Sequence, residues 1–95
     1  MAAVYILYSI SMDKFYIGSC LNLEERLDEH KNKEYSNSFT AKVDDWALYF
    51  FMAELEYKQA RNIEKHIKEM KSKKYVQDLK KYPEMTMKLK NKYSF

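Results

Sequence analysis

Apolar residues are grouped in short runs along this chain, and the first two runs predict a β-hairpin. Both AVYILYS at residues 3–9 and KFYIGSC at residues 14–20 are rich in Val, Ile, Tyr and Phe, and a turn-like stretch separates them. The turn contains neither Gly nor Asn, so its type stays open. A hairpin centred on Ile10–Ser11 would place Tyr5 directly opposite Tyr16, about 5 Å apart on one face of the sheet.

A helix is expected after the hairpin. Asn22 followed by Glu25 resembles a capping box, and the helical spacing of LNLEERLDEHKN predicts a helix from Leu23 to about Lys33. At about 100° per residue, Leu23 and Leu27 share an apolar stripe. Two polar side chains border this stripe, Arg26 and His30.

The next segments predict a loop, a strand and a second helix. Residues 33–45 are polar and suit a surface loop. The unbroken apolar run WALYFFMAEL at residues 46–55 predicts a third strand in a central position. Residues 57–71 have the amphipathic spacing of a helix, with Glu64 beside its apolar stripe. That stripe consists of Ala60, Ile63, Ile67 and Met70.

The last part of the chain predicts one more short helix. Residues 73–82 allow it, and Pro83 ends it. The pattern of residues 83–95 does not decide whether this tail packs or frays. The chain is therefore expected to be an α+β domain over residues 1–82, in the order β-β-α-β-α-α, with a small, mainly antiparallel three-stranded sheet flanked by helices.

Length and cysteine content limit the class of protein. A chain of 95 residues can form one compact core. Cys20 is the single cysteine, which excludes an intramolecular disulfide and a multi-cysteine zinc site, and which favours a reducing, cytoplasmic location. The apolar start of the chain is far shorter than the roughly 20 residues of a membrane-spanning helix, so no membrane association is expected.

Charge is distributed unevenly along the chain. Residues 1–64 contain 7 Lys or Arg and 11 Asp or Glu, whereas residues 65–95 contain 10 and 3, a net charge of +7. Such asymmetry is typical of a surface that binds a phosphate backbone, although a solvated lysine-rich helix face would have the same composition. The candidate nucleic-acid-binding residues are Lys68, Lys71, Lys73 and Lys74.

Several motifs together resemble those of the GIY-YIG nuclease family. The first half of the motif corresponds to Ala3-Val4-Tyr5 and the second half to Tyr16-Ile17-Gly18, and LEERLDEH and QARNIEKHIK follow at family-like spacing. The resemblance covers roughly residues 3–80. It is strongest to small stand-alone members similar to the N-terminal domain of the nucleotide-excision-repair incision enzyme, and it implies the fold and the DNA-cleaving activity of an endonuclease.

The resemblance also implies roles for individual residues. Glu64 is implied to hold one divalent ion, Mg²⁺ or Mn²⁺, and Gly18 is the glycine of the second half-motif and the single glycine of the chain. The other implied catalytic residues are Tyr5, Tyr16, Arg26 and His30. Two positions depart from the family pattern: Ala3 replaces the first motif glycine, and Ser19 stands where some relatives have a lysine.

These residue types suit phosphodiester hydrolysis. Because Mg²⁺ keeps several of its waters, a single carboxylate such as Glu64 is an adequate protein ligand. Arg26 offers a planar, permanently charged fork to a phosphate. Arg26 and the ion would lower the pKa of a nearby tyrosine. The resemblance favours a motif tyrosine as the proton acceptor, with Tyr5 chosen over Tyr16, and His30 is a credible alternative base or proton relay.

The sequence leaves the DNA substrate open. A domain of this size is expected to cut in a structure-selective or weakly sequence-specific way, or to be delivered by a targeting protein partner. The alternative is a non-catalytic nucleic-acid-binding module on the same fold. A protein-interaction domain that uses the tyrosine-rich surface has no specific support, and the oligomeric state is not readable from the pattern.

Overall fold

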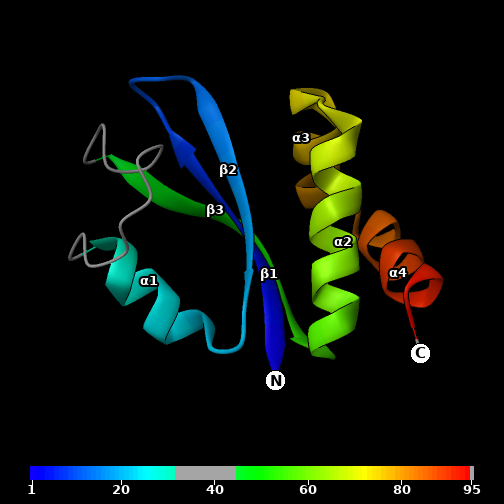
Figure 1. Cartoon of the computed structure of the whole chain (residues 1–95). Helices are drawn as coiled ribbons and strands as arrows, with labels where there is room; N and C mark the ends of the chain where they lie inside the picture. The colour runs from blue at the N-terminus through cyan, green and yellow to red at the C-terminus, as the bar shows by residue number, and fades with distance from the viewer. Residues whose placement is uncertain (32–44, 95) are drawn as a thin grey trace.

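The computed structural model describes residues 1–31 and 45–94, with the backbone alone for residues 29–31. The described elements are β1 (Ala2–Ser9), β2 (Lys14–Cys20), α1 (Leu23–Lys31), β3 (Trp46–Leu55), α2 (Tyr57–Met70), α3 (Lys73–Lys81) and α4 (Pro83–Lys92) (Figure 1). They form an α+β arrangement with one three-stranded antiparallel sheet, as the sequence pattern predicts. The loop expected over residues 33–45 lies almost entirely outside the described residues.

The strand order is β2-β1-β3, so the central strand is β1 and not the third strand. The prediction of a central position for residues 46–55 was therefore wrong. All but one of the β1 side chains are buried, whereas β3 leaves Leu48 and Phe51 40% and 48% exposed. A continuous apolar run is consistent with burial on both faces but does not establish it, because an edge strand with large half-exposed side chains has the same pattern.

The register of the hairpin also differs from the predicted one. Tyr5 pairs with Gly18, and Tyr16 pairs with Leu7, because the turn contains four residues rather than two. Asp13 closes this turn in the left-handed region, with φ of 50°. The difference of two residues in register keeps Tyr5 and Tyr16 on the same face of the sheet, since side chains alternate along a strand. Their ring centroids lie 6.3 Å apart.

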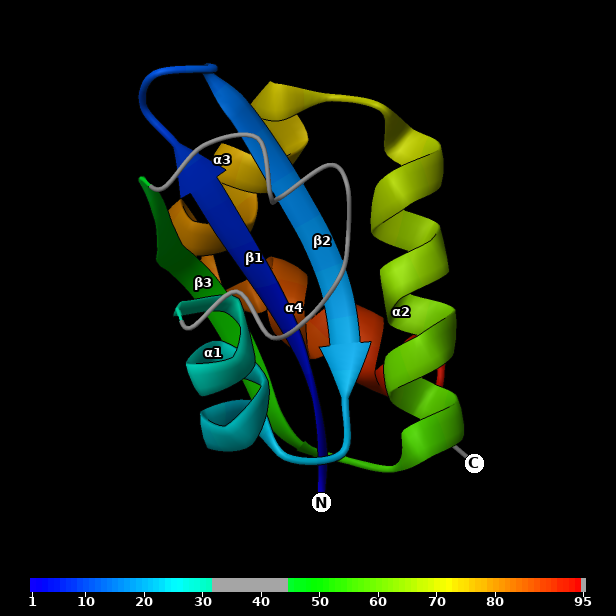
Figure 2. The same cartoon turned by 60° about the vertical axis from the view of Figure 1, so that its left-hand side comes forward.

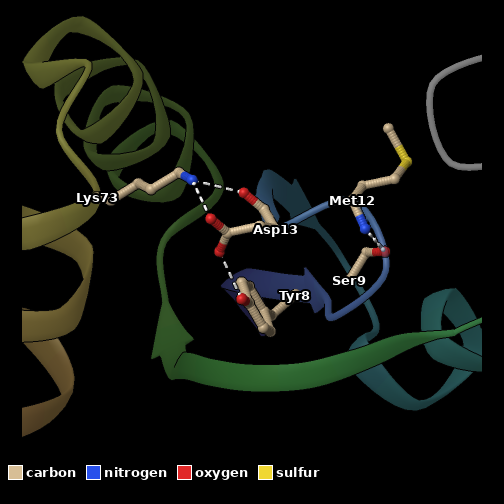
Figure 3. A network of polar contacts seen from close by, with 5 residues as sticks. All are labelled: Tyr8, Ser9, Met12, Asp13 and Lys73. Carbon is tan, nitrogen blue, oxygen red and sulfur yellow. Dashed lines mark hydrogen bonds and ion pairs between the residues drawn. The ribbon is translucent and has the colours of Figure 1, made fainter.

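A network of polar contacts ties the turn to the start of α3 (Figure 3). The Tyr8 hydroxyl donates a hydrogen bond of 2.6 Å to Asp13 Oδ1. Lys73 Nζ lies 2.9 Å from Asp13 Oδ2 and 2.6 Å from the Asp13 carbonyl oxygen. The Ser9 hydroxyl accepts a bond from the backbone N–H of Met12. These contacts hold a turn that lacks glycine in one conformation.

The helices cover both faces of the sheet. Figure 1 shows α1 on one side and α2, α3 and α4 on the other. The larger core lies on the α2 side, where the buried residues of α2 (Ala60, Ile63 and Ile67) pack in one cluster with Val4 and Ile6 of β1. On the α1 side, Leu23 and Leu27 pack against a smaller cluster that contains Tyr5. Figure 2 shows β2 as the strand nearest α2.

The segment after Pro83, whose packing the pattern left undecided, forms α4. Pro83 lies in the first turn, where its missing N–H costs no helical hydrogen bond. Leu89 is buried in the larger core. The Gln59 side chain donates a hydrogen bond of 2.9 Å to the carbonyl oxygen of Lys90, so α4 is attached to α2 by both apolar and polar contacts.

Candidate functional site

A cavity of about 260 Å³ lies along the outer edge of β2. Five residues that the sequence analysis selected line it together: Tyr5, Tyr16, Gly18, Arg26 and Glu64. They come from β1, β2, α1 and α2, so segments distant in sequence meet here. The side chain of His30 lies outside the described residues. The cavity brings a guanidinium, a carboxylate and two phenols to one place.

Gly18 is required by a close approach and not by its backbone conformation. No glycine of the chain has a positive φ, so the left-handed region is not the reason for this residue. A Cβ atom at Gly18 would lie 2.5 Å from the Tyr5 hydroxyl and 2.6 Å from Tyr5 Cζ. The phenol of Tyr5 crosses directly over its cross-strand partner, which leaves no space for a methyl group.

Burial governs the ionisation of Tyr5. The side chain is 0% exposed, and burial together with the neighbouring Tyr16 raises the pKa of Tyr5 above its ordinary value. A hydrogen bond from Arg26 lowers the Tyr5 pKa, as expected from the sequence, but this effect is smaller than that of burial. Burial therefore opposes the lowering of the Tyr5 pKa that Arg26 alone would give. Tyr16 is half-buried in the same cavity.

Two side chains hold the carboxylate of Glu64. Its Oε2 accepts a 2.6 Å hydrogen bond from Lys68 Nζ, and its Oε1 accepts one from the Ser19 hydroxyl. The side chain of Glu64 is 16% exposed. In the sequence, Ser19 was noted only because some relatives have a lysine at its position. In the structure its hydroxyl donates to the Glu64 carboxylate and so orients it.

Glu64 fits a hard divalent cation. It is a carboxylate on a cavity with little apolar lining, and each carboxylate oxygen has a second acceptor site in addition to the bonds from Ser19 and Lys68. An ion held by this one protein ligand would keep most of its water ligands, as Mg²⁺ commonly does. In the described part of the chain, no three His, Cys, Asp or Glu side chains form a metal-binding group.

Three lining residues were not selected as site residues from the sequence: Ser19, Tyr57 and Arg61. Arg61 Nη1 donates a 3.0 Å hydrogen bond to the Tyr57 hydroxyl, and the Arg61 guanidinium carbon lies 5.8 Å from the centre of the Tyr57 ring. Tyr57 and Glu64 together raise the pKa of Arg61. Helical spacing contains a signal for this pair, because residues 57, 61 and 64 share one face of α2.

The four candidate lysines do not form one group. Lys68, Lys71 and Lys73 line a second cavity, of about 240 Å³, together with Lys14 and an apolar floor that includes Ile17. Lys73 also forms the ion pair with Asp13, so part of its role is internal. Lys74 is not among the lining residues of this cavity, and its Nζ lies 3.7 Å from Asp78 Oδ1. Lys68 connects the two cavities through its contact with Glu64.

A family comparison accounts for this arrangement. The model of the GIY-YIG catalytic domain matches residues 1–77 of the 95-residue chain. The chain belongs to the GIY-YIG family. GIY-YIG proteins are nuclease-type proteins, generally endonucleases, so nucleic acid is the class of substrate. Neither a search of curated proteins nor a search of solved structures found a match. Among the described residues, no helix is long and apolar enough to cross a membrane.

The GIY-YIG motif of this chain tolerates alanine in its first half. Ala3 is 2% exposed and packs in the smaller core cluster with Leu7 and Cys20. Its methyl group adds to an apolar contact on the α1 side of the sheet, and Tyr5 pairs with Gly18 of the second half-motif. The substitution of the first motif glycine therefore fits this fold.

Proposed function

We propose that this GIY-YIG protein is a divalent-metal-dependent endonuclease that hydrolyses phosphodiester bonds in DNA. One observation carries the proposal: Arg26, Tyr16 and Glu64, from three separate elements, line a single cavity at the edge of the sheet. A cation-binding carboxylate, a phosphate-binding guanidinium and a group that can hold a proton are the parts that this hydrolysis needs.

Arg26 and Glu64 would bind the two charged partners. Arg26 donates one hydrogen bond to Tyr5 and has further N–H donors for the non-bridging oxygens of the scissile phosphate. Glu64 would hold one Mg²⁺ or Mn²⁺, with Ser19 orienting its carboxylate. When bound there, the ion would supply positive charge to the phosphate and to the leaving oxygen.

The proton acceptor is assigned to Tyr16, with His30 as the alternative. The oxygen of a water forms a bond to phosphorus, its proton passes to the acceptor, and the bond from phosphorus to the leaving sugar oxygen breaks. Burial disfavours the phenolate of Tyr5, so Tyr5 would accept the hydrogen bond from Arg26 and would not take up the proton of the water. Tyr16 is half-buried and would accept the proton as a phenolate, whose negative charge Arg26 and Arg61 of the same cavity would stabilise.

The lysines of the second cavity would bind the DNA backbone on one side of the cleavage site. Lys68, Lys71 and Lys73 lie beyond Glu64 at the same edge of the sheet, and Lys74 adds charge nearby. Contacts of this kind position a strand without reading its sequence. They support structure-selective or weakly sequence-specific cutting, or delivery to a site by a targeting protein partner.

Cleavage of a panel of DNAs tests the proposal. Duplex, single-stranded, flapped and branched DNAs are incubated with Mg²⁺, with Mn²⁺ or with excess EDTA. We expect cutting with either metal, none in EDTA, and a loss of roughly 100-fold or more in Glu64→Ala and Arg26→Ala. Glu69→Ala is the matched control, because Glu69 lies on the same helix and pairs with Lys65 at i, i+4. It should cut like the wild type.

The rival function is a non-catalytic nucleic-acid-binding module, supported by the same lysine-lined cavity. Affinity for DNA that falls steeply with salt, without cleavage under any of these conditions, would favour this module over the nuclease. Cleavage that persists in EDTA would exclude the role of the ion. DNA binding that does not respond to salt would contradict both functions.

A further inference from the structure

Arg61 and Tyr57 form a pair on one face of α2, and this face borders the cavity. The hydrogen bond of 3.0 Å and a cation–π contact of 5.8 Å hold the two side chains together. Both line the cavity that contains Arg26 and Glu64. Tyr57 also lines an adjoining cavity of about 230 Å³, again with Arg26. Tyr57 and Arg26 therefore both line two adjoining cavities.

The charged side chains that line the cavity have a net positive charge, which favours binding of an anion. Its described lining residues include two guanidiniums, Arg26 and Arg61, and one carboxylate, Glu64. The hydrogen-bond partner of Arg61 in the described part of the chain is a neutral phenol and not a carboxylate. A guanidinium with a neutral partner keeps its full charge and most of its five donors.

We propose that Arg61, oriented by Tyr57, is a second phosphate-binding residue of the cavity and takes a backbone phosphate adjacent to the one that Arg26 binds. This inference rests on the proposed function, since it requires a nucleic-acid strand in the cavity. The Tyr57 hydroxyl accepts the hydrogen bond from Arg61 and can donate its own proton to the same phosphate. Arg61 is the phosphate ligand, and Tyr57 positions it.

The chain contains a matched control for this pair. Lys92 Nζ lies 5.6 Å from the centre of the Tyr93 ring, at the end of α4. Lys92 is thus, like Arg61, a helical cation over a tyrosine ring, but it is not among the residues that line the cavity. Arg61→Gln and Lys92→Gln each remove one positive charge from an exposed helix position. Circular dichroism checks that both variants fold.

The experiment measures binding of a fluorescent single-stranded oligonucleotide by anisotropy, at several salt concentrations and in EDTA so that the DNA stays intact. We expect Arg61→Gln to bind about 10-fold more weakly, as loss of one charge-assisted contact implies. The slope of log affinity against log salt should decrease by about 0.7, the contribution of one phosphate contact on a single strand. Lys92→Gln should match the wild type in both the affinity and the salt slope.

Two further variants separate charge from positioning. Arg61→Lys should keep the salt slope but lose affinity, because an ammonium has no planar fork. Tyr57→Phe should keep the salt slope and raise KM for cleavage more than it lowers kcat, since it disturbs the orientation of a binding group.

The outcomes distinguish this inference from the proposed function. If wild-type protein binds and cuts DNA but Arg61→Gln behaves like Lys92→Gln, the second phosphate site is wrong and the nuclease stands. If Arg61→Gln loses affinity without a change in salt slope, Arg61 acts by packing and not on a phosphate. If the wild type does not bind DNA, the inference and the proposed function both fail.

Discussion

The phenol of Tyr5 lies across Gly18, its cross-strand partner in the hairpin. The ring occupies the space that a side chain at position 18 would need. Tyr5 also lines the cavity, and Arg26 donates a hydrogen bond to it. The two halves of the motif thus depend on each other sterically.

Gly18→Ala should destabilise the protein. A methyl group 2.5 Å from the Tyr5 hydroxyl forces the buried ring or the strand to move, at a cost of about 1–3 kcal/mol in the free energy of unfolding. Urea unfolding of Gly18→Ala, Tyr5→Leu and the double variant measures the coupling between the two positions. The double variant should be less destabilised than the two single effects added together, and strict additivity would contradict the contact.

Tyr5 should make stability fall at alkaline pH. Its pKa in the folded protein is raised by burial, so both states carry the proton below about pH 10, and above that pH the unfolded chain releases it first. Stability attributable to Tyr5 is then lost at up to about 1.4 kcal/mol per pH unit. Urea unfolding from pH 8 to 11 should show a shallower decline in Tyr5→Phe, and equal slopes would show that burial does not govern this phenol.

Ser19→Ala should weaken metal dependence without changing the fold. Removing the hydroxyl that donates to Glu64 leaves the carboxylate less well oriented. The Mg²⁺ concentration for half-maximal cleavage should rise by roughly 10-fold or more. Ser94→Ala, an exposed serine near the end of the chain, is the control and should show no change. Unchanged Mg²⁺ dependence in Ser19→Ala would assign the serine a structural role.

Acid should weaken the hairpin turn through Asp13. The hydrogen bond from Tyr8 and then the ammonium of Lys73 lower the pKa of Asp13 below its usual 3.8. Because the folded pKa is depressed, the stability from Asp13 is present above about pH 4 and is lost as pH falls through the folded value. Thermal unfolding from pH 6 to 2 should show a smaller acid loss in Asp13→Asn. Asp28→Asn, an exposed carboxylate on α1, should keep the wild-type profile.

Helix α4 should contribute to the stability of the whole domain. Leu89 is 5% exposed and belongs to the larger core, so Leu89→Ala should cost about 2–4 kcal/mol. Met87 lies on the same helix but is 63% exposed, and Met87→Ala should cost little. Equal effects of the two substitutions on chemical unfolding would mean that α4 does not pack as described.

Local patterns were sufficient for every described element except α4, and the family resemblance supplied most of the site. Apolar spacing predicted three strands and helices over residues 57–71 and 73–82, which correspond to α2 and α3, because periodicity depends on neighbours in the sequence. The resemblance to the GIY-YIG motifs implied the site residues Tyr5, Tyr16, Gly18, Arg26 and Glu64, and the fold brings them to one cavity. Even a hairpin shifted by two residues left both tyrosines on one face, since strand side chains alternate.

Other properties depend on contacts between distant segments, and only the tertiary structure decided them. The four-residue turn, the central place of β1 and the packing of Leu89 follow from which surfaces meet. The sequence could not show that Gly18 makes room for Tyr5, nor that burial outweighs Arg26 in setting the Tyr5 pKa. Steric exclusion and desolvation act through space, so they become visible only once the chain is folded.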